Sequence, residues 1–219
     1  MEPELRLADL PSTIYLFPVE RFILLPETTL PLSIVDSRVQ EILDGAQAAS
    51  GYIGVIERRP KEERADSRYY AVGCLGRIRL NAHEEEYRVT LEGVIRFRVR
   101  ELLAEGSKVL PQATVAYEEF ERDLHPAEDE AEGWNPEEFK AAFLQLGRQS
   151  SGRESTSMES MSPAQIVRFL AQTMPLAAAE KQALLEAPSF RELMVLLFQL
   201  LAINYLTTTP DNTSSPQAN

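Results

Sequence analysis

The chain has 219 residues, 44% of them hydrophobic, which is enough for one large domain or two small ones. Its net charge of -12 and sequence pI near 4.8 make nucleic acid unlikely as a partner, because phosphate contacts need clustered Lys and Arg. A single cysteine, Cys74, excludes an intrachain disulfide. The acidic N-terminus has no apolar signal segment, and no apolar run approaches the roughly 20 residues that span a bilayer. These features predict a cytoplasmic protein with no membrane partner.

Residues 12–119 are predicted to form a β-rich part. Apolar runs, and runs in which apolar and polar residues alternate with a period of two, indicate strands with at least one buried face. They lie at Ile14–Phe17, Tyr52–Ile56, Ala71–Leu80, Tyr87–Leu91 and Ile95–Val99. Gly93, between the last two runs, is expected at a bulge or a sharp bend. One helix, capped by Asp36, interrupts the strands.

Residues 136–206 are predicted to form a bundle of helices, because the apolar period changes from 2 to 3.6. Helix-start patterns occur at Asn135 with Pro136, at Ser162 with Pro163, and at Ser189. Residues 120–135 read as an acidic linker and residues 207–219 as a disordered tail. The predicted class is therefore α+β, with a mostly antiparallel barrel or sandwich followed by a helical bundle.

The sequence does not indicate a catalytic centre. Cys74 lies between apolar residues of a predicted strand, so a small buried core residue is favoured over a nucleophile. The two histidines, His83 and His125, occur in separate polar segments and lack a second ligand at metal spacing. The lysines lie in polar or charge-rich segments, where no apolar pocket is expected to lower their pKa; they are Lys61, Lys108, Lys140 and Lys181. We therefore expect no enzyme activity, no metal and no cofactor.

Arginines on the predicted strands form the first candidate binding feature. They fall on the side opposite the apolar residues of their strands, at Arg77, Arg79, Arg88, Arg96, Arg98 and Arg100. If these strands are neighbours, the arginines form a basic stripe that could bind acidic side chains or peptide carboxylates. The alternative is a solvated sheet face on which the arginines pair with nearby glutamates, and this alternative is favoured because most surface charges contribute little.

Leucines in a proline-broken segment form the second candidate feature. Leu24, Leu25, Leu30 and Leu32 lie where Pro26 and Pro31 prevent a regular central strand. They could line an apolar groove beside the barrel. The alternative is that they close one open end of the barrel as part of the core, and this is favoured because exposed apolar patches are uncommon without a partner.

Several short motifs, in their order along the chain, resemble the N-terminal substrate-binding domain of the LON proteases. The motifs are Phe17-Pro18, Leu25-Pro26, Pro31-Leu32, Asp36 with Arg38, Val72-Gly73, Gly76-Arg77-Ile78, Leu91 to Gly93, Arg96-Phe97-Arg98, Lys181-Gln182 and Leu184-Leu185-Glu186. The resemblance covers about residues 12–206. The sequence departs from the family near Glu27 and Thr28, where the family usually has a glycine.

The resemblance implies a PUA-like antiparallel β pseudo-barrel, a C-terminal helical bundle and a protein without the ATPase and peptidase parts. The implied function is non-enzymatic recognition of unfolded or exposed polypeptide segments, or docking on a partner protein as an adaptor in protein quality control. An RNA-associated PUA-like protein is the main alternative, which the acidic pI disfavours. A small hydrolase with an unrecognised site is a third possibility that no residue cluster supports.

Overall fold

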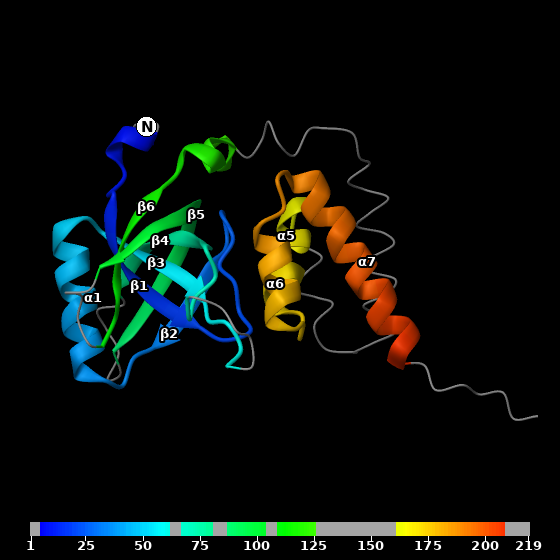
Figure 1. Ribbon diagram of the computed structural model, residues 1–219, viewed down its shortest axis with the longest axis horizontal. Helices are drawn as coiled ribbons and strands as arrows, with labels where there is room; N and C mark the ends of the chain where they lie inside the picture. The colour runs from blue at the N-terminus through cyan, green and yellow to red at the C-terminus, as the bar shows by residue number, and fades with distance from the viewer. Residues whose placement is uncertain (1–4, 62–66, 81–86, 104–108, 126–160, 209–219) are drawn as a thin grey trace, which may run out of the picture.

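The computed structural model describes residues 5–61, 67–80, 87–103, 109–125 and 161–208. Its class is α+β, as the sequence predicts. A mixed sheet lies on one side of the molecule, and helices α5 (Pro163–Thr173), α6 (Ala178–Leu185) and α7 (Phe190–Thr208) stand together on the other (Figure 1). Helix α1 (Ser37–Ala49) covers the far side of the sheet (Figure 1). The helix predicted after Asn135, and most of the predicted acidic linker and tail, lie outside the described residues.

The sheet closes on itself. Its strands are β1 (Thr13–Val19), β2 (Thr29–Ser33), β3 (Tyr52–Glu57), β4 (Val72–Leu80), β5 (Arg88–Leu103) and β6 (Gln112–Ala116). They are ordered β2-β5-β4-β3-β1-β6, and β6 also pairs with β5. Five strands therefore form a ring, and β2 lies outside it along the edge of β5. Strands β1 and β3 are parallel, and every other pairing is antiparallel.

The two strands predicted on either side of Gly93 are one long strand, β5, with a bulge. Leu75 of β4 pairs with Ile95, but Gly76 pairs with Gly93, so Val94 is the extra residue. A Cβ atom at Gly93 would lie 2.0 Å from the carbonyl oxygen of Leu25. Only glycine fits there, because the backbone of the β1–β2 connection crosses directly over the strand.

Two strands were not predicted. Strand β2 contains Pro31 and survives because it lies at an edge, where a missing N–H donor is tolerated. Strand β6 buries only Ala113 and Val115, too weak an alternation to stand out in the sequence, yet it is the strand that closes the ring.

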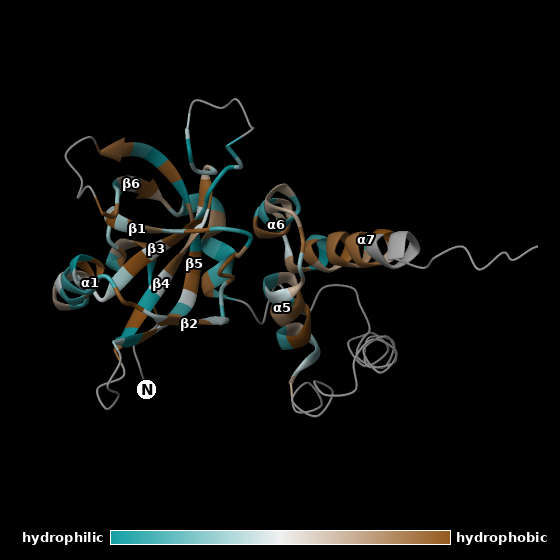
Figure 2. Ribbon diagram, turned by 90° about the horizontal axis from the view of Figure 1, so that it is seen from below, coloured by the Kyte–Doolittle hydropathy of each residue, from teal (hydrophilic) through white to brown (hydrophobic). Residues whose placement is uncertain are grey.

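The core runs through the interior of the ring and continues to the helices. Phe97 is fully buried, and its ring packs on the backbone of β3 and β4 at Gly54 and Gly73. Hydrophobic and hydrophilic positions alternate along the strands, whereas α7 is hydrophobic over most of its described length (Figure 2). One connected apolar cluster includes Leu16 of the ring together with Ile166 and Leu197 of the helices. The two parts therefore share a single core.

The helices begin where the sequence predicts. Helix α1 (Ser37–Ala49) starts at Asp36, whose carboxylate accepts a hydrogen bond from the Arg38 amide. Helix α5 (Pro163–Thr173) opens with a capping box between Ser162 and Gln165. Helices α6 (Ala178–Leu185) and α7 (Phe190–Thr208) follow, with Ser189 capping α7. The three helices contact one another pairwise.

The acidic stretch begins inside the packed structure. A short 3-10 helix, η1 (Leu7–Asp9), precedes β1, and a second, η2 (Glu118–Leu124), follows β6. Phe120 of η2 is buried, and Asp123 pairs with Arg96 of β5. The packed β part therefore extends through η2, beyond the boundary at residue 119 that the sequence suggests.

Buried polar side chains connect the sheet to the helices. Gln172 of α5 donates to the Thr29 carbonyl at 2.8 Å, and Gln182 of α6 donates to the Val72 carbonyl at 3.1 Å. Directional hydrogen bonds of this kind set the orientation of the helices against the sheet. The candidate sites described below lie along this junction.

Candidate functional site

The four predicted groove leucines are mostly core. Leu24, Leu25 and Leu30 are buried at 1%, 3% and 8% exposure, and Leu32 is half-buried. Leu24 lies against Gly76 and Gly93 of the sheet, and Leu25 lines the junction with α7. An incoming polypeptide therefore cannot reach the three buried leucines. The proline-broken segment folds inward because its apolar side chains gain more from burial than an irregular backbone costs.

The edge of β2 is poorly suited to bind a polypeptide as an added strand. On this edge the Thr29 carbonyl already accepts the Gln172 side chain. Pro31 has no N–H group, so it interrupts the row of donors that an added strand requires. Recognition by strand addition is therefore disfavoured at this edge.

Arg96 does not belong to a surface stripe. Its side chain is 9% exposed and pairs with Asp123, with the Nη2 and Oδ1 atoms 2.7 Å apart. It also donates to the Leu185 and Ala187 carbonyls at the end of α6. The prediction that Arg96 faces solvent is wrong because η2 folds back over this part of β5. Arg96 instead joins the sheet, η2 and α6.

Three of the other predicted arginines have partners on the surface. Arg98 binds Glu119 through two hydrogen bonds of 2.7 and 2.6 Å and holds the pKa of that carboxyl below its usual range. Arg79 pairs with Glu92 at 2.9 Å, and Arg77 lies over the ring of Tyr52. Arg88 is exposed at the start of β5. The strands are neighbours, and on this face Arg79 and Arg98 have carboxylate partners.

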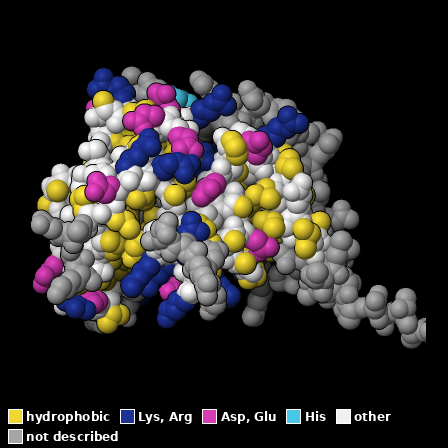
Figure 3. Space-filling model, viewed as in Figure 1, with side chains coloured by type: hydrophobic (Ala, Val, Ile, Leu, Met, Phe, Trp, Pro, Cys, Tyr) yellow, Lys and Arg dark blue, Asp and Glu magenta, His cyan; other side chains and the backbone are white. Residues whose placement is uncertain are grey.

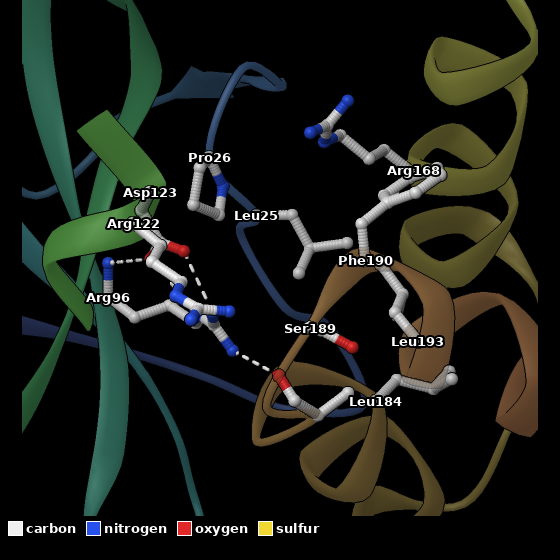
Figure 4. Close-up of a pocket in the computed structure, with 11 residues that line it drawn as sticks. Leu25, Pro26, Arg96, Arg122, Asp123, Arg168, Leu184, Ser189, Phe190 and Leu193 are labelled. Atoms are coloured by element: carbon white, nitrogen blue, oxygen red, sulfur yellow. Dashed lines mark hydrogen bonds and ion pairs between the residues drawn. The ribbon is translucent and has the colours of Figure 1, made fainter. Parts of the chain in front are cut away.

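A small cavity lies where Arg96 meets the helices (Figure 4). It has a volume of about 40 Å³ and lies between Leu25, Asp123 and Arg168, with Phe190 and Leu193 of α7 on the helical side (Figure 4). A water occupies roughly 10–15 Å³ by this measure, so the cavity has room for about three waters and none for a ligand side chain. It is part of the sheet–helix junction.

The expectation for Lys181 is wrong. Its side chain is completely buried in α6, and its Nζ atom donates to the Ala171 and Gln172 carbonyls at the end of α5, at 2.8 and 2.7 Å. Burial lowers its pKa to about 8. Although the sequence around α6 is rich in charged residues, the Lys181 side chain faces α5. Lys181 therefore caps the C-terminus of a neighbouring helix.

A second, much larger hollow lies between the end of the sheet and the start of α6. Its volume is about 830 Å³, within the range of ligand sites. Five basic residues line it: Arg21, Arg58, Arg59, Lys61 and Arg68. Only two acidic residues, Glu20 and Glu57, do so among the described residues. We call this hollow the basic cleft. Lys and Arg side chains gather along this lower edge of the molecule, between the sheet and the helices (Figure 3).

Glu57, at the end of β3, organises one wall of the basic cleft. Its carboxylate accepts hydrogen bonds from the amides of Arg21 and Phe22, at 2.7 and 3.0 Å. Arg21 has a φ of +56°, in the left-handed region that arginine rarely adopts. Burial raises the pKa of Glu57. The Glu57 carboxylate thus stabilises a strained turn that places the exposed residue Arg21 beside the cleft.

Part of this cleft is indicated by the sequence. Arg58 and Arg59 follow a buried strand and precede Pro60, so two cations are placed where the chain must turn away from the sheet. Arg21 could not be associated with them, because its proximity depends on the parallel pairing of β1 with β3. Residues 62–66, which carry three acidic side chains and one basic one, lie outside the described residues.

The Cys74 thiol and the described metal-ligating side chains were the remaining candidates for reactive chemistry. Cys74 is completely buried in β4, as predicted, and burial raises the pKa of its thiol, so a reactive thiolate is disfavoured. Within the described part of the chain, no group of three His, Cys, Asp or Glu side chains could hold a metal ion. The same part of the chain contains no helix long and apolar enough to cross a membrane.

A closed mixed sheet joined to helices, with a large charged cleft at the junction, defines an α+β protein with one prominent surface site. Comparison with known proteins identifies its relatives. The chain belongs to the ATP-dependent protease La (LON) substrate-binding domain family, whose model matches residues 13–202.

Curated relatives are whole proteases. The chain is 26% identical over 198 residues to Lon protease 2 of Myxococcus xanthus and 24% identical over 198 residues to Lon protease of Anaeromyxobacter dehalogenans. Each match covers 88% of this chain but only 24% and 23% of those proteins, respectively. The chain thus spans about a quarter of the length of the curated relatives it matches.

Two solved structures share the fold. One is a Lon N-terminal domain protein from Xanthomonas campestris, with a TM-score of 0.56 and 20% identity, covering 88% of this chain and 98% of that one. The other is the N-terminal domain of a Mycobacterium avium complex Lon protease, with a TM-score of 0.57 and 21% identity, covering 87% and 98%. Both support the α+β fold.

Proposed function

We propose that this protein binds exposed segments of other polypeptides without cleaving them, as a recognition or adaptor module in protein quality control. The observation that carries the proposal is the match of residues 13–202 to a substrate-binding domain family. Solved N-terminal domains of Lon proteins, which share the fold over 87–88% of the chain, support the comparison at the level of architecture.

The finer architecture that we propose is a PUA-like pseudo-barrel followed by a helical bundle. The pairing of β6 with both β1 and β5 supports the first part, since it leaves β2 as the strand outside the ring. The pairwise contacts among α5, α6 and α7 support the second. A cytoplasmic location is part of the proposal and accords with the single, buried Cys74.

Binding without catalysis is supported by the state of the reactive groups. The Cys74 thiol is inaccessible, and the Lys181 amine is occupied by two backbone carbonyls. A nucleophile must be exposed to its substrate and lie beside an activating base. Neither Cys74 nor Lys181 meets the first of these conditions.

We propose that the basic cleft, rather than the predicted leucine groove, is the main binding surface. Leu24, Leu25 and Leu30 are needed for the core, whereas the cleft opens to solvent and has the volume of a ligand site. The exposed arginines of β4 and β5, including Arg79 and Arg88, form a competing surface, which the experiments below separate from the cleft.

Fluorescence anisotropy with a labelled, permanently unfolded polypeptide tests the function. Association and ordering of a flexible chain offset most of what a few contacts contribute, so the expected Kd is about micromolar or weaker. The same polypeptide in its folded form, labelled identically, is the control and should bind at least about tenfold more weakly. Equal binding of the two forms, or no binding of the unfolded form up to high micromolar concentration, would contradict the proposal.

A further inference from the structure

We propose that the basic cleft selects carboxylate-bearing segments, so that acidic stretches of polypeptide are its preferred ligands. This inference rests on the proposed function and specifies its ligand chemistry. It is unexpected for a protein of net charge -12, which should repel acidic chains over most of its surface.

Among the described residues, the charge of the cleft is locally unbalanced. Arg21, Lys61 and Arg68 are exposed, and no ion pair or hydrogen bond of their side chains is found within the described part of the chain. Arg58 has a partner, Glu20, but at 3.6 Å and with both side chains at least half exposed. Such a pair contributes little and can be exchanged for a ligand carboxylate. This differs from the β4–β5 face, where Arg79 and Arg98 have closer carboxylate partners.

Glu57, the buried one of the two described acidic residues on the cleft wall, does not cancel the positive charge of the cleft. Glu57 is 1% exposed, and its carboxylate already accepts hydrogen bonds from the Arg21 and Phe22 amides. Burial raises the pKa of Glu57, and the two amides, together with the charge of the buried Lys181, partly counter that rise. The surface offered to a ligand is therefore more basic than the composition of the wall suggests.

The start of α6 adds a second attraction for anions. Ala177 and Ala178 line the cleft, and Ala177 has no side chain that could cap the helix. The Glu180 carboxylate accepts a hydrogen bond from the Ala177 amide. The amides of the first helical turn have no intrahelical partners, and the helix dipole favours negative charge at this end. The helix and the arginines thus favour the same ligand group from two sides.

A peptide fits these features better than a nucleic acid. Single-stranded nucleic acids are bound through aromatic platforms alternating with cations, and Tyr69 is the only aromatic residue among the described residues that line the cleft. A long polyanion would also extend onto acidic surface, whereas a peptide of a few residues can remain within about 830 Å³. Carboxylates also match the planar, two-pronged guanidinium groups.

The test measures fluorescence anisotropy of three labelled peptides of equal length with the full chain. The first carries several glutamates, the second has glutamine at each of these positions, and the third has lysine. The variant Arg21→Glu/Arg68→Glu reverses two charges of the cleft. Arg191→Glu is the matched control, because Arg191 is exposed at the start of α7, beyond the opposite end of α6. The single variant Arg68→Glu leaves the strained turn untouched and replaces the double variant if that one does not fold.

We expect the glutamate peptide to bind at least about tenfold more tightly than the glutamine peptide, and the lysine peptide to bind most weakly. Cleft reversal should weaken glutamate-peptide binding about tenfold or more, while Arg191→Glu changes it less than about twofold. Raising the salt concentration should weaken this binding too, because the attraction is electrostatic.

Three results would overturn the inference. If the glutamate and glutamine peptides bind equally while the unfolded polypeptide still binds, acid selection fails but the proposed function stands. If neither peptide nor the unfolded polypeptide binds, both fail. If a labelled single-stranded RNA of equal charge binds more tightly than the glutamate peptide, and cleft reversal abolishes that binding, the cleft is a nucleic-acid site instead.

Discussion

Two groups of arginines, at opposite ends of the sheet–helix junction, show what a sequence can reveal about charge. On β4 and β5, alternation correctly marks which residues point away from the ring, but Arg96 and Arg98 are paired with Asp123 and Glu119 of η2. At the basic cleft the cations come from separate segments of the chain, and Arg21 and Arg68 have no such partner among the described residues.

The direction of a side chain follows from the local sequence, whereas the pairing of its charge depends on tertiary contacts. Asp123 lies 27 positions after Arg96, beyond the end of the predicted β part. Its approach depends on the chain reversing after β6, a strand that the sequence did not indicate. Arg96 therefore stabilises the fold, while the exposed Arg21 and Arg68 can contribute to function. The predictions below test this division.

The largest effect is expected at Arg96. Replacing Arg96 with alanine leaves Asp123 buried without its partner and removes the donors to the end of α6, so the free energy of unfolding should fall by about 3–5 kcal/mol. Chemical denaturation followed by circular dichroism measures this. Arg79→Ala, which breaks an exposed pair, is the control and should cost less than about 1 kcal/mol. Equal losses for the two variants would remove the structural role assigned to Arg96.

The variant Leu24→Ala tests whether the leucine segment belongs to the core or lines a binding groove. With 1% exposure, Leu24→Ala should destabilise the protein by about 2–5 kcal/mol through lost burial and a residual cavity. Val35, at 94% exposure, is the apolar control, and Val35→Ala should change stability by less than about 0.5 kcal/mol. A stable Leu24→Ala variant that no longer binds polypeptide would instead restore the predicted groove.

Lys181 should make stability depend on pH in an unusual direction. Its pKa is about 8 in the folded chain and near 10.4 when unfolded, so between these values the unfolded state binds more protons. Stability should therefore rise with pH in this window. Between pH 7.5 and 9.5, the free energy of unfolding of the wild type should rise by about 1–2 kcal/mol relative to that of Lys181→Met. The neutral amine keeps two N–H groups, enough for the Ala171 and Gln172 carbonyls.

The measurement for Lys181 is the difference between the denaturation midpoints of the two proteins across that pH range. Raised tyrosine pKa values, such as that of Tyr87, act at higher pH and are common to both proteins, so they cancel. A difference that stays constant with pH would mean that Lys181 is not deprotonated in the folded chain in this range.

The smallest effect on stability is expected at the basic cleft. Arg68→Ala should change the free energy of unfolding by less than about 0.5 kcal/mol, because the side chain is exposed and forms no ion pair with the described residues. Thermal unfolding followed by circular dichroism is sufficient to measure it. A loss above about 1 kcal/mol would place Arg68 with the structural arginines of β5.

Much of the fold was predictable because its signals are local. Asp36, Ser162 and Ser189 mark helix starts through their own hydrogen bonds, and Gly93 marks the bulge where β5 passes under Leu25. The closing of the ring was not predictable in the same way. It depends on β6, whose short and weakly apolar segment becomes a strand only because β1 and β5 pair with it.

The sequence departs from the family pattern near Glu27 and Thr28, and the backbone shows how the turn forms without glycine. Glu27 has a φ of +61° in the turn after Pro26, in which the Thr28 amide donates to the Leu25 carbonyl. Glycine is the residue that ordinarily occupies this conformation. Glu27 instead pairs with Arg168 of α5 at 3.2 Å, a contact that glycine could not make. The loop keeps its turn and gains a link to the helices.

The candidate site was less predictable than the fold. The burial of Leu24 and Lys181 and the gathering of Arg21, Arg58 and Arg68 all depend on which segments the topology brings together. Resemblance to a family indicated binding of polypeptides but assigned no surface to it. The surface emerges only when the strand order is known.

The central claim is that polypeptides bind at the basic cleft and not on the arginine face of β4 and β5. Amide chemical-shift mapping by NMR, with the isotope-labelled full chain and the glutamate peptide, tests it most directly. The account predicts the largest shifts at Arg21, Arg58, Tyr69 and Ala178, with little change at Arg79, Arg88 and Arg98. The largest shifts at these last three residues, with an undisturbed cleft, would contradict it.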